Sequence, residues 1–159
     1  MPIYGGFWIR FGAYLIDAIL LGVVGAVIGG VLGVGVGLTA RLGQQSVNDT
    51  MLGAQMLSAL INLGIGWLYY AVMESSANQG TLGKMALGLV VSDEMGNRIS
   101  FGRATGRYFA KILSGLILLI GYIMIAFTER KQGLHDMLAG TLVSKKGTLT
   151  GTNAAKVFS

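Results

Sequence analysis

The chain has 159 residues, of which 53% are hydrophobic and only 12% are charged, and its mean hydropathy is +0.65. Soluble domains carry about 25% charged residues, so this composition excludes an ordinary soluble protein and indicates one compact membrane unit. The net charge of +5 does not predict nucleic-acid binding, because the cations flank apolar runs as they do at a cytoplasmic membrane face. With no cysteine and one histidine, a disulfide framework and a multi-histidine metal site are excluded.

The first apolar segment begins with a pair of opposite charges. Arg10 and Asp17 are seven residues apart, which is about two helical turns, so both lie on nearly the same helix face. The run over 13–38 is long enough to cross ~30 Å of hydrocarbon, and it is longer than the core of a signal peptide, so we expect a retained span. A glycine ladder within it lets another helix approach closely, either the second span, which we favour, or a second copy. The ladder consists of Gly25, Gly29, Gly33 and Gly37.

A second apolar segment, over 51–73, carries a stripe of neutral polar side chains. They fall within a sector of roughly 80° on a helix, so they face protein or water rather than lipid. Interhelical hydrogen bonding is the simpler interpretation, because amides and hydroxyls serve this purpose in membranes, and a polar pathway is the alternative. The stripe consists of Gln55, Ser58, Asn62 and Tyr69.

The segment over 74–100 is polar and rich in turn residues. Two short β-favouring pieces, 87–92 and 97–101, flank a predicted hairpin turn at 93–97. Ser100 is placed to cap a following helix. That helix carries a cation at every fourth residue, which predicts either a basic face on anionic lipid headgroups or simple snorkelling. The three cations are Arg103, Arg107 and Lys111.

The third apolar run, 112–127, has only 16 residues, so it is marginal for a full span and is compatible with a broken or re-entrant helix. Three full spans would divide the cations six against six, whereas a re-entrant segment leaves only Arg41 on one side and eleven on the other. The positive-inside rule favours the second arrangement, with the N-terminus in the cytoplasm. A short helical turn and a strand are expected over 133–143, and a flexible polar tail over 147–159.

Three motifs give the chain a specific resemblance to a known family. Residues 4–17 contain Arg10 and Asp17, residues 81–84 read Thr-Leu-Gly-Lys, and residues 134–141 contain Asp136. In this order and spacing they resemble the RDD family of bacterial membrane proteins, which takes its name from an arginine and two aspartates. The resemblance implies a multi-pass protein of the bacterial cytoplasmic membrane, with a single domain over 1–146. The expected fold is a small all-α transmembrane bundle of two full spans and a third, short or re-entrant helix, with short β-favouring cytoplasmic segments.

Two functions are compatible with these features. In the first, the chain is an accessory or scaffold subunit of a membrane assembly, and Arg10, Asp17 and Asp136 form a charge-paired cytoplasmic base. In the second, it is an oligomeric cation/proton or small-solute transporter in which Asp17 carries the proton or ion. The expected partners are membrane lipids and either further copies of the chain or a larger complex. We expect no enzyme activity, cofactor or metal, because no nucleophile–base pair, ligand spacing or phosphate loop is present.

Overall fold

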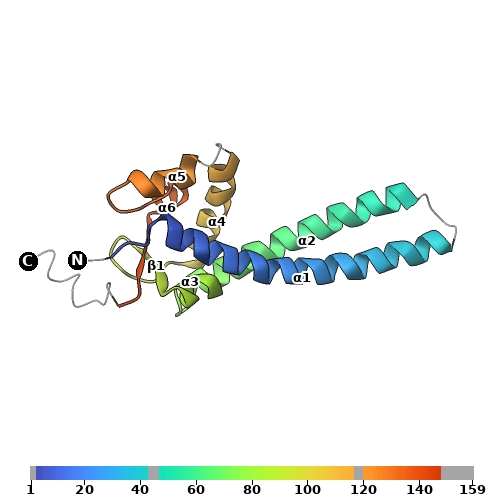
Figure 1. Cartoon of the computed structure of the whole chain (residues 1–159), viewed down its shortest axis with the longest axis horizontal. Coiled ribbons are helices and arrows are strands. Elements are labelled where there is room, and N and C mark those ends of the chain that lie inside the picture. Colours follow the sequence, from blue (N-terminus) through green and yellow to red (C-terminus); the bar gives the residue numbers. More distant parts are fainter. Residues whose placement is uncertain (1–2, 43–46, 117–119, 148–159) are drawn as a thin grey trace, which may run out of the picture. The chain divides into compact units, whose positions relative to one another are not determined.

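The computed structural model describes residues 3–42, 47–116 and 120–147 (Figure 1). Two long helices, α1 (Phe7–Arg41) and α2 (Val47–Ser75), contain segments long and apolar enough to cross a membrane, Phe7–Thr39 and Thr50–Ser75. They coincide with the two predicted spans and extend beyond both. The predicted polar tail lies outside the described residues, apart from Gly147.

The chain divides into two compact units, which are considered separately. The helix-pair unit is Ala18–Gly66, and it holds the central part of α1 and most of α2. The charged unit is Met1–Asp17 together with Trp67–Ser159, and it holds the first turns of α1, the last turns of α2 and all later elements. Every residue of the ionic groups around Arg10, Glu74 and Asp136, and of the hydrogen bonds to Asp17, belongs to the charged unit.

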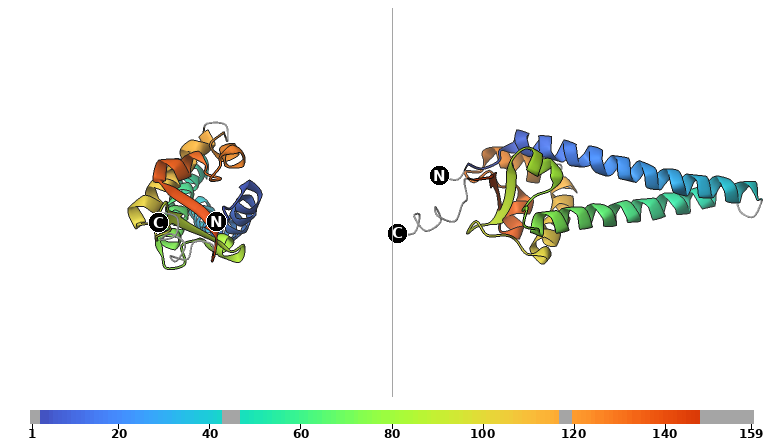
Figure 2. Two further views of the ribbon diagram at one scale, coloured as in Figure 1. Left: turned by 90° about the vertical axis from the view of Figure 1, so that its left-hand side faces the viewer. Right: turned by 90° about the horizontal axis from the view of Figure 1, so that it is seen from below.

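The later elements of the charged unit are four short helices and a two-stranded sheet. Helix α4 contacts α5 and α6, and the three are grouped together in Figures 1 and 2. Alanine, leucine, valine and isoleucine side chains from both strands, from the ends of α1, α2 and α4 and from Ile99 form a small apolar core. The elements are α3 (Leu82–Ala86), β1 (Leu89–Asp93), α4 (Phe101–Leu116), α5 (Ile120–Phe127), α6 (Leu134–Ala139) and β2 (Thr141–Lys145).

The sheet pairs strands that are distant in sequence. Strands β1 and β2 are antiparallel, with Leu89 opposite Lys145 and Asp93 opposite Thr141. The N-terminal residues run along the other edge of β2, where Tyr4 bridges Ser144 and the Gly5 amide donates to the Val143 carbonyl at 2.9 Å. The start of α1 is thereby tied to the segment that follows α6.

The predicted hairpin over 87–101 is wrong. The Asp93 carboxylate accepts hydrogen bonds from the backbone amides of Met95 and Asn97, at 2.9 and 2.7 Å, so the chain turns without forming a returning strand. Phe101 is the first residue of α4, and the Ser100 hydroxyl accepts from the Arg103 amide at 3.2 Å, as its capping role predicts. The place of the second strand is taken by β2.

The third apolar run is not one helix in the part of the chain that the structure describes. It begins inside α4 and ends with α5, on either side of residues 117–119, which lie outside the described residues. Neither helix reaches the length of a span, so two helices remain as candidate spans among the described residues. The chain is a small helical membrane protein with a short two-stranded sheet.

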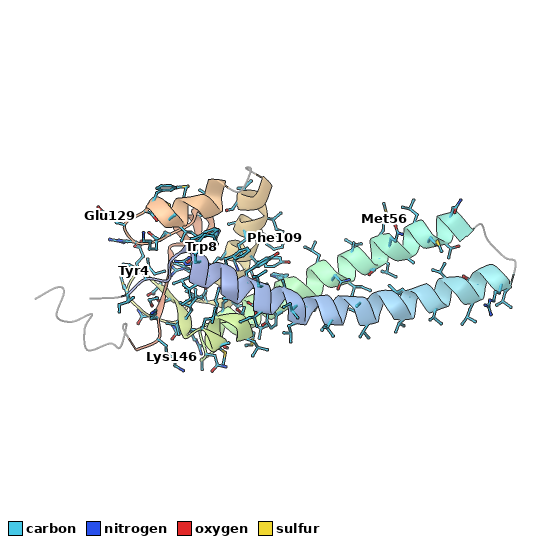
Figure 3. All side chains as sticks on the ribbon, in the orientation of Figure 1. Tyr4, Trp8, Met56, Phe109, Glu129 and Lys146 are labelled. Atoms are coloured by element: carbon cyan, nitrogen blue, oxygen red, sulfur yellow. The ribbon has the colours of Figure 1, made fainter. Side chains whose placement is uncertain are left out.

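In the helix-pair unit, the glycine ladder contacts α2 at its first member. A Cβ atom on Gly25 would lie 2.9 Å from the Asn62 amide oxygen, so this glycine permits a close approach. A Cβ atom on Gly29, Gly33 or Gly37 would meet no described atom within 4 Å. Figure 3 shows Met56 projecting outward from α2, where its side chain is exposed.

Candidate functional site

Arg10 is fixed by all three nitrogens of its guanidinium group. Its Nε donates to the Gly5 carbonyl at 2.6 Å, one terminal nitrogen donates to the Asp136 carboxylate, and the other donates to the Lys131 carbonyl at 2.5 Å. Because the guanidinium is planar and its donors have fixed directions, these three acceptors together select arginine rather than lysine. Arg10 therefore connects α1 to the N-terminal segment and to the residues on both sides of the start of α6.

Asp136 lies at the start of α6 and is completely buried. It faces two guanidinium groups, those of Arg10 and Arg107, and the Arg107 nitrogen lies 2.6 Å from its carboxylate. The Gly133 amide also donates to it, at 3.2 Å. Burial by itself would raise the pKa of this carboxyl, but Arg107 and Arg10 outweigh burial and hold the pKa below its usual range. Asp136 is therefore an ionised carboxylate between two cations.

Glu74, in the last turn of α2, is the second buried carboxylate with several cationic partners. Lys84 and Lys111 both donate to its Oε1 atom, Lys111 at 3.3 Å, and Arg107 donates to Oε2 at 3.2 Å. Since Arg107 contacts Glu74 as well as Asp136, it joins the two carboxylates into one group. We call this group the buried charge cluster. It consists of Arg10, Glu74, Lys84, Arg107, Lys111 and Asp136.

Asp17 lies outside this cluster and is held by three hydrogen bonds. The Tyr69 hydroxyl and the Gly83 amide donate to its Oδ1 at 2.7 and 2.8 Å, and the Thr81 hydroxyl donates to Oδ2 at 2.6 Å. All three partners are donors, so the carboxylate serves as an acceptor only. We call Asp17, Tyr69, Thr81 and Gly83 the Asp17 anchor, because they attach the start of α3 to α1 and α2.

Gly83 is the position in the anchor where only a hydrogen atom fits. A Cβ atom there would lie 2.1 Å from the Ala13 carbonyl oxygen and 2.9 Å from the Asp17 carboxyl carbon. The backbone of α3 thus lies directly against α1, which is what allows the Gly83 amide to reach the carboxylate. The small residue in the Thr-Leu-Gly-Lys motif is explained by this contact.

The three residues expected to form one charged base are thus arranged differently. Arg10 and Asp136 are in contact, as one of the expected pairings requires, but Asp17 is bonded to hydroxyl and amide donors instead of to Arg10. Two helical turns separate Arg10 from Asp17 by roughly 10 Å along the axis, and the Arg10 side chain is directed to the N-terminal segment and α6.

The basic face of α4 also differs from expectation. Arg107 is completely buried, and Lys111 lies at the rim of the cluster with its ammonium 4.1 Å from the centre of the Tyr70 ring. Arg103 alone of the three cations is exposed, and it lies 4.0 Å from Asp93. The four-residue spacing does place Arg107 and Lys111 on one face, and that face packs against the carboxylates of Glu74 on α2 and Asp136 on α6.

The polar stripe of the second span is divided between the two units. Tyr69 belongs to the Asp17 anchor. In the helix-pair unit, the Asn62 amide donates to the Ser58 carbonyl at 2.8 Å, so this pair is bonded within α2. An open groove of about 450 Å³ lies beside them between α1 and α2. Its lining includes Gly29, Gly33, Gln55, Ser58 and Asn62.

His135 precedes Asp136 and is buried. Burial is the main cause that lowers its pKa to about 3. Asp136 opposes this effect, and the nearby cations Arg107 and Lys111 act in the same direction as burial. It is therefore a neutral imidazole at physiological pH. The described residues contain no group of three or more His, Cys, Asp or Glu side chains that could hold a metal ion.

Comparison with known proteins places the sequence in a family. The family model described as "RDD family" matches residues 4–140, which is most of the chain and includes Arg10, Asp17 and Asp136. The chain belongs to the RDD family. The match confirms the resemblance seen in the sequence motifs.

Several curated relatives of this RDD-family chain come from Bacillus subtilis. "Uncharacterized protein YxaI" is 45% identical over 89% of this chain and 97% of its own length. "Uncharacterized membrane protein YteJ" is 33% identical over 88% of this chain and 80% of its own length, and "Uncharacterized protein YckC" is 27% identical over 91% and 87%. No solved structure matches the chain. These relatives support a bacterial membrane protein.

Sequence reasoning missed four members of the RDD-type site. Glu74 falls in a predicted loop, although an acid directly after an apolar span requires a cationic partner. Thr81, Gly83 and Lys84 lie in the quoted motif without an assigned role. A hydroxyl and a glycine next to a lysine could have indicated a backbone approach to a carboxylate, but the sequence does not show which carboxylate.

Proposed function

We propose that this protein is an accessory or scaffold subunit of a bacterial membrane assembly, whose charged unit serves as a fixed base for its spanning helices. One observation carries the proposal: the arginine and both aspartates that name the family are engaged in structural contacts. Arg10 makes three hydrogen bonds, Asp17 accepts three, and Asp136 lies between two guanidinium groups. Such arrangements hold several segments in one geometry, which supports a role in presenting the helices to a partner.

Cation/proton exchange is the alternative that these contacts make less favourable. A carrier carboxyl has to release its partners in each cycle, whereas Asp17 would lose three hydrogen bonds, each worth about 1.5–3 kcal/mol when it involves a charged group. The groove in the helix-pair unit is the feature that favours transport, because neutral polar side chains line it. It contains no described acidic side chain among its lining residues.

The proposal includes an orientation in which the charged unit faces the cytoplasm, since most cations of the chain belong to that unit. Because the chain has no cysteine, single cysteines can report it. Lys145→Cys is expected to react with an impermeant maleimide only after the cells are opened. Leu42→Cys, at the end of α1, is the control that should react in intact cells, and labelling of Lys145→Cys in intact cells would contradict the orientation.

The function itself is tested by native mass spectrometry of the protein gently extracted from its own membrane. The scaffold proposal predicts a mixed assembly with at least one other membrane protein in fixed ratio. A bare monomer or a pure homo-oligomer would contradict it. In the same preparation, proteoliposomes containing the chain alone should show no cation-driven proton flux above empty vesicles, and a flux abolished by Asp17→Asn would establish transport instead.

A further inference from the structure

The buried charge cluster contains twice as many cations as carboxylates. Four basic side chains surround Glu74 and Asp136, which leaves a surplus of two positive charges. Of the other acidic side chains that the structure describes, Asp17 is in its own anchor, Asp93 and Glu94 face Arg103 and Arg130, and Glu129 is exposed. A buried net charge costs several kcal/mol, so an anion bound beside the cluster would stabilise it.

The surplus is concentrated where Lys84 and Lys111 meet. Both ammonium groups and Arg107 share the single carboxylate of Glu74. The Lys84 ammonium has three donors, and Glu74 is its one acceptor among the described residues, although the Lys84 side chain is only 9% exposed. A ligand with several acceptor oxygens would accept hydrogen bonds from the Lys84 donors that Glu74 leaves over.

The place of this edge in the chain indicates which anion can reach it. Arg10 lies in the first turn of the candidate span Phe7–Thr39, and Glu74 lies in the last turn of Thr50–Ser75. The ends of spans lie at the depth of lipid headgroups. Lys111 has 18% of its side chain exposed, more than any other member of the cluster, so an anion would enter the cluster beside it.

We propose that the Lys84–Lys111 edge of the buried charge cluster binds a phosphate-bearing anion, supplied either by the headgroup of an acidic phospholipid or by free inorganic phosphate. Arg107 would add a third cation behind the two lysines. This site goes beyond the proposed function and does not depend on whether the chain has a protein partner.

Binding is expected to depend on the protonation of Lys84. Burial lowers the pKa of Lys84 to about 7, with Arg107 and Lys111 acting in the same direction and Glu74 opposing them. Without a bound anion, the cluster can therefore reduce its surplus by losing this proton near neutral pH. A bound anion favours the charged lysine, so affinity should fall as the pH rises above 7. The groups that face Lys84 and its partners are Tyr70 and Glu74 on α2, Arg107 and Lys111 on α4, Asp136 on α6 and Arg10 on α1.

The test uses the full chain and two probes. In neutral detergent, inorganic phosphate is titrated calorimetrically. In nanodiscs that mix phosphatidylcholine with phosphatidylglycerol, retained lipids are counted by native mass spectrometry. Lys111→Gln should weaken binding by about tenfold, the equivalent of one lost charge-assisted hydrogen bond. Arg103→Gln removes the same charge from an exposed position on the same helix and should change binding less than about twofold.

The outcomes separate the two sources of phosphate. Selective retention of phosphatidylglycerol, with no heat of binding in the phosphate titration, supports a headgroup site. A heat of binding for inorganic phosphate, with no preference for phosphatidylglycerol, supports a site for free phosphate. Absence of both, or equal weakening by Lys111→Gln and Arg103→Gln, overturns the proposal. If Lys111→Gln does not fold, the unmodified chain decides. Where phosphatidylglycerol is selectively retained, retention that is constant between pH 6 and 9 also overturns the proposal, because this lipid does not titrate in that range.

Discussion

Replacing Gly83 by alanine tests the contact between α3 and α1 that the Asp17 anchor requires. The added Cβ atom would lie 2.1 Å from the Ala13 carbonyl oxygen, whereas real Cβ contacts are essentially never under 3.0 Å. The helix therefore has to move by about 0.9 Å. The Gly83 amide, now 2.8 Å from the Asp17 carboxylate, would then lie beyond hydrogen-bonding distance.

The expected cost has two parts. Forced repacking of a close contact costs about 1–3 kcal/mol, and loss of a hydrogen bond to a charged group costs about 1.5–3 kcal/mol. Gly83→Ala should thus lower the free energy of unfolding by roughly 2.5–6 kcal/mol. This is a large fraction of the stability of a small domain, so partial loss of folded protein is expected.

The assay is unfolding in mixed micelles with increasing dodecyl sulfate, followed by circular dichroism. Gly106→Ala is the matched control, because Gly106 lies exposed inside α4 and a Cβ atom there meets nothing within 4 Å. The free energy of unfolding of this control should rise by about 0.5–1 kcal/mol, because alanine is more stable than glycine in a helix interior. If Gly83→Ala behaves like Gly106→Ala, α3 does not lie against α1 and the anchor is refuted.

Two further predictions concern Arg10 of the buried charge cluster and His135, which lies beside the cluster. Arg10→Lys keeps the charge but cannot reach Gly5, Lys131 and Asp136 together, so it should lower the free energy of unfolding by about 2–4 kcal/mol in the same assay. Arg103→Lys, at an exposed site, should lower it by less than about 0.5 kcal/mol. Equal losses in the two variants would contradict the fixed role of Arg10. Because burial lowers the pKa of His135 to about 3, the unfolded state binds more protons than the folded state between pH 3 and 6.5, so stability should fall as the pH is lowered through that range. His135→Gln should flatten this slope, and an unchanged slope would show that other groups cause it.

The helices of the spans were predictable because hydropathy and length decide them locally. The pairing of the sheet was not predictable, because the turn residues at 93–97 predict a hairpin whether or not a returning strand exists. The true partner, β2, lies about 50 residues further along the chain, and only the fold brings it to β1.

The site was predictable only in part, because its members come from segments that only the fold brings together. Arg10 and Asp136 could be paired by charge, but a basic face on α4 looks identical whether it meets lipid phosphates or buried carboxylates. Arg107 faces carboxylates because Glu74 and Asp136, from different elements, converge on it. The partners of Asp17 include a backbone amide, and a backbone donor leaves no signal in side-chain chemistry.

The central claim is that the family's charged residues hold the structure together, and Asp17→Asn tests it most directly. An amide at this site keeps the shape but has one acceptor oxygen where the carboxylate has two, so the free energy of unfolding should fall by about 1–3 kcal/mol in lipid nanodiscs. Glu129→Gln makes the same chemical change at an exposed position and should leave the free energy of unfolding unaltered. Equal stability of Asp17→Asn and the unmodified chain would contradict the account.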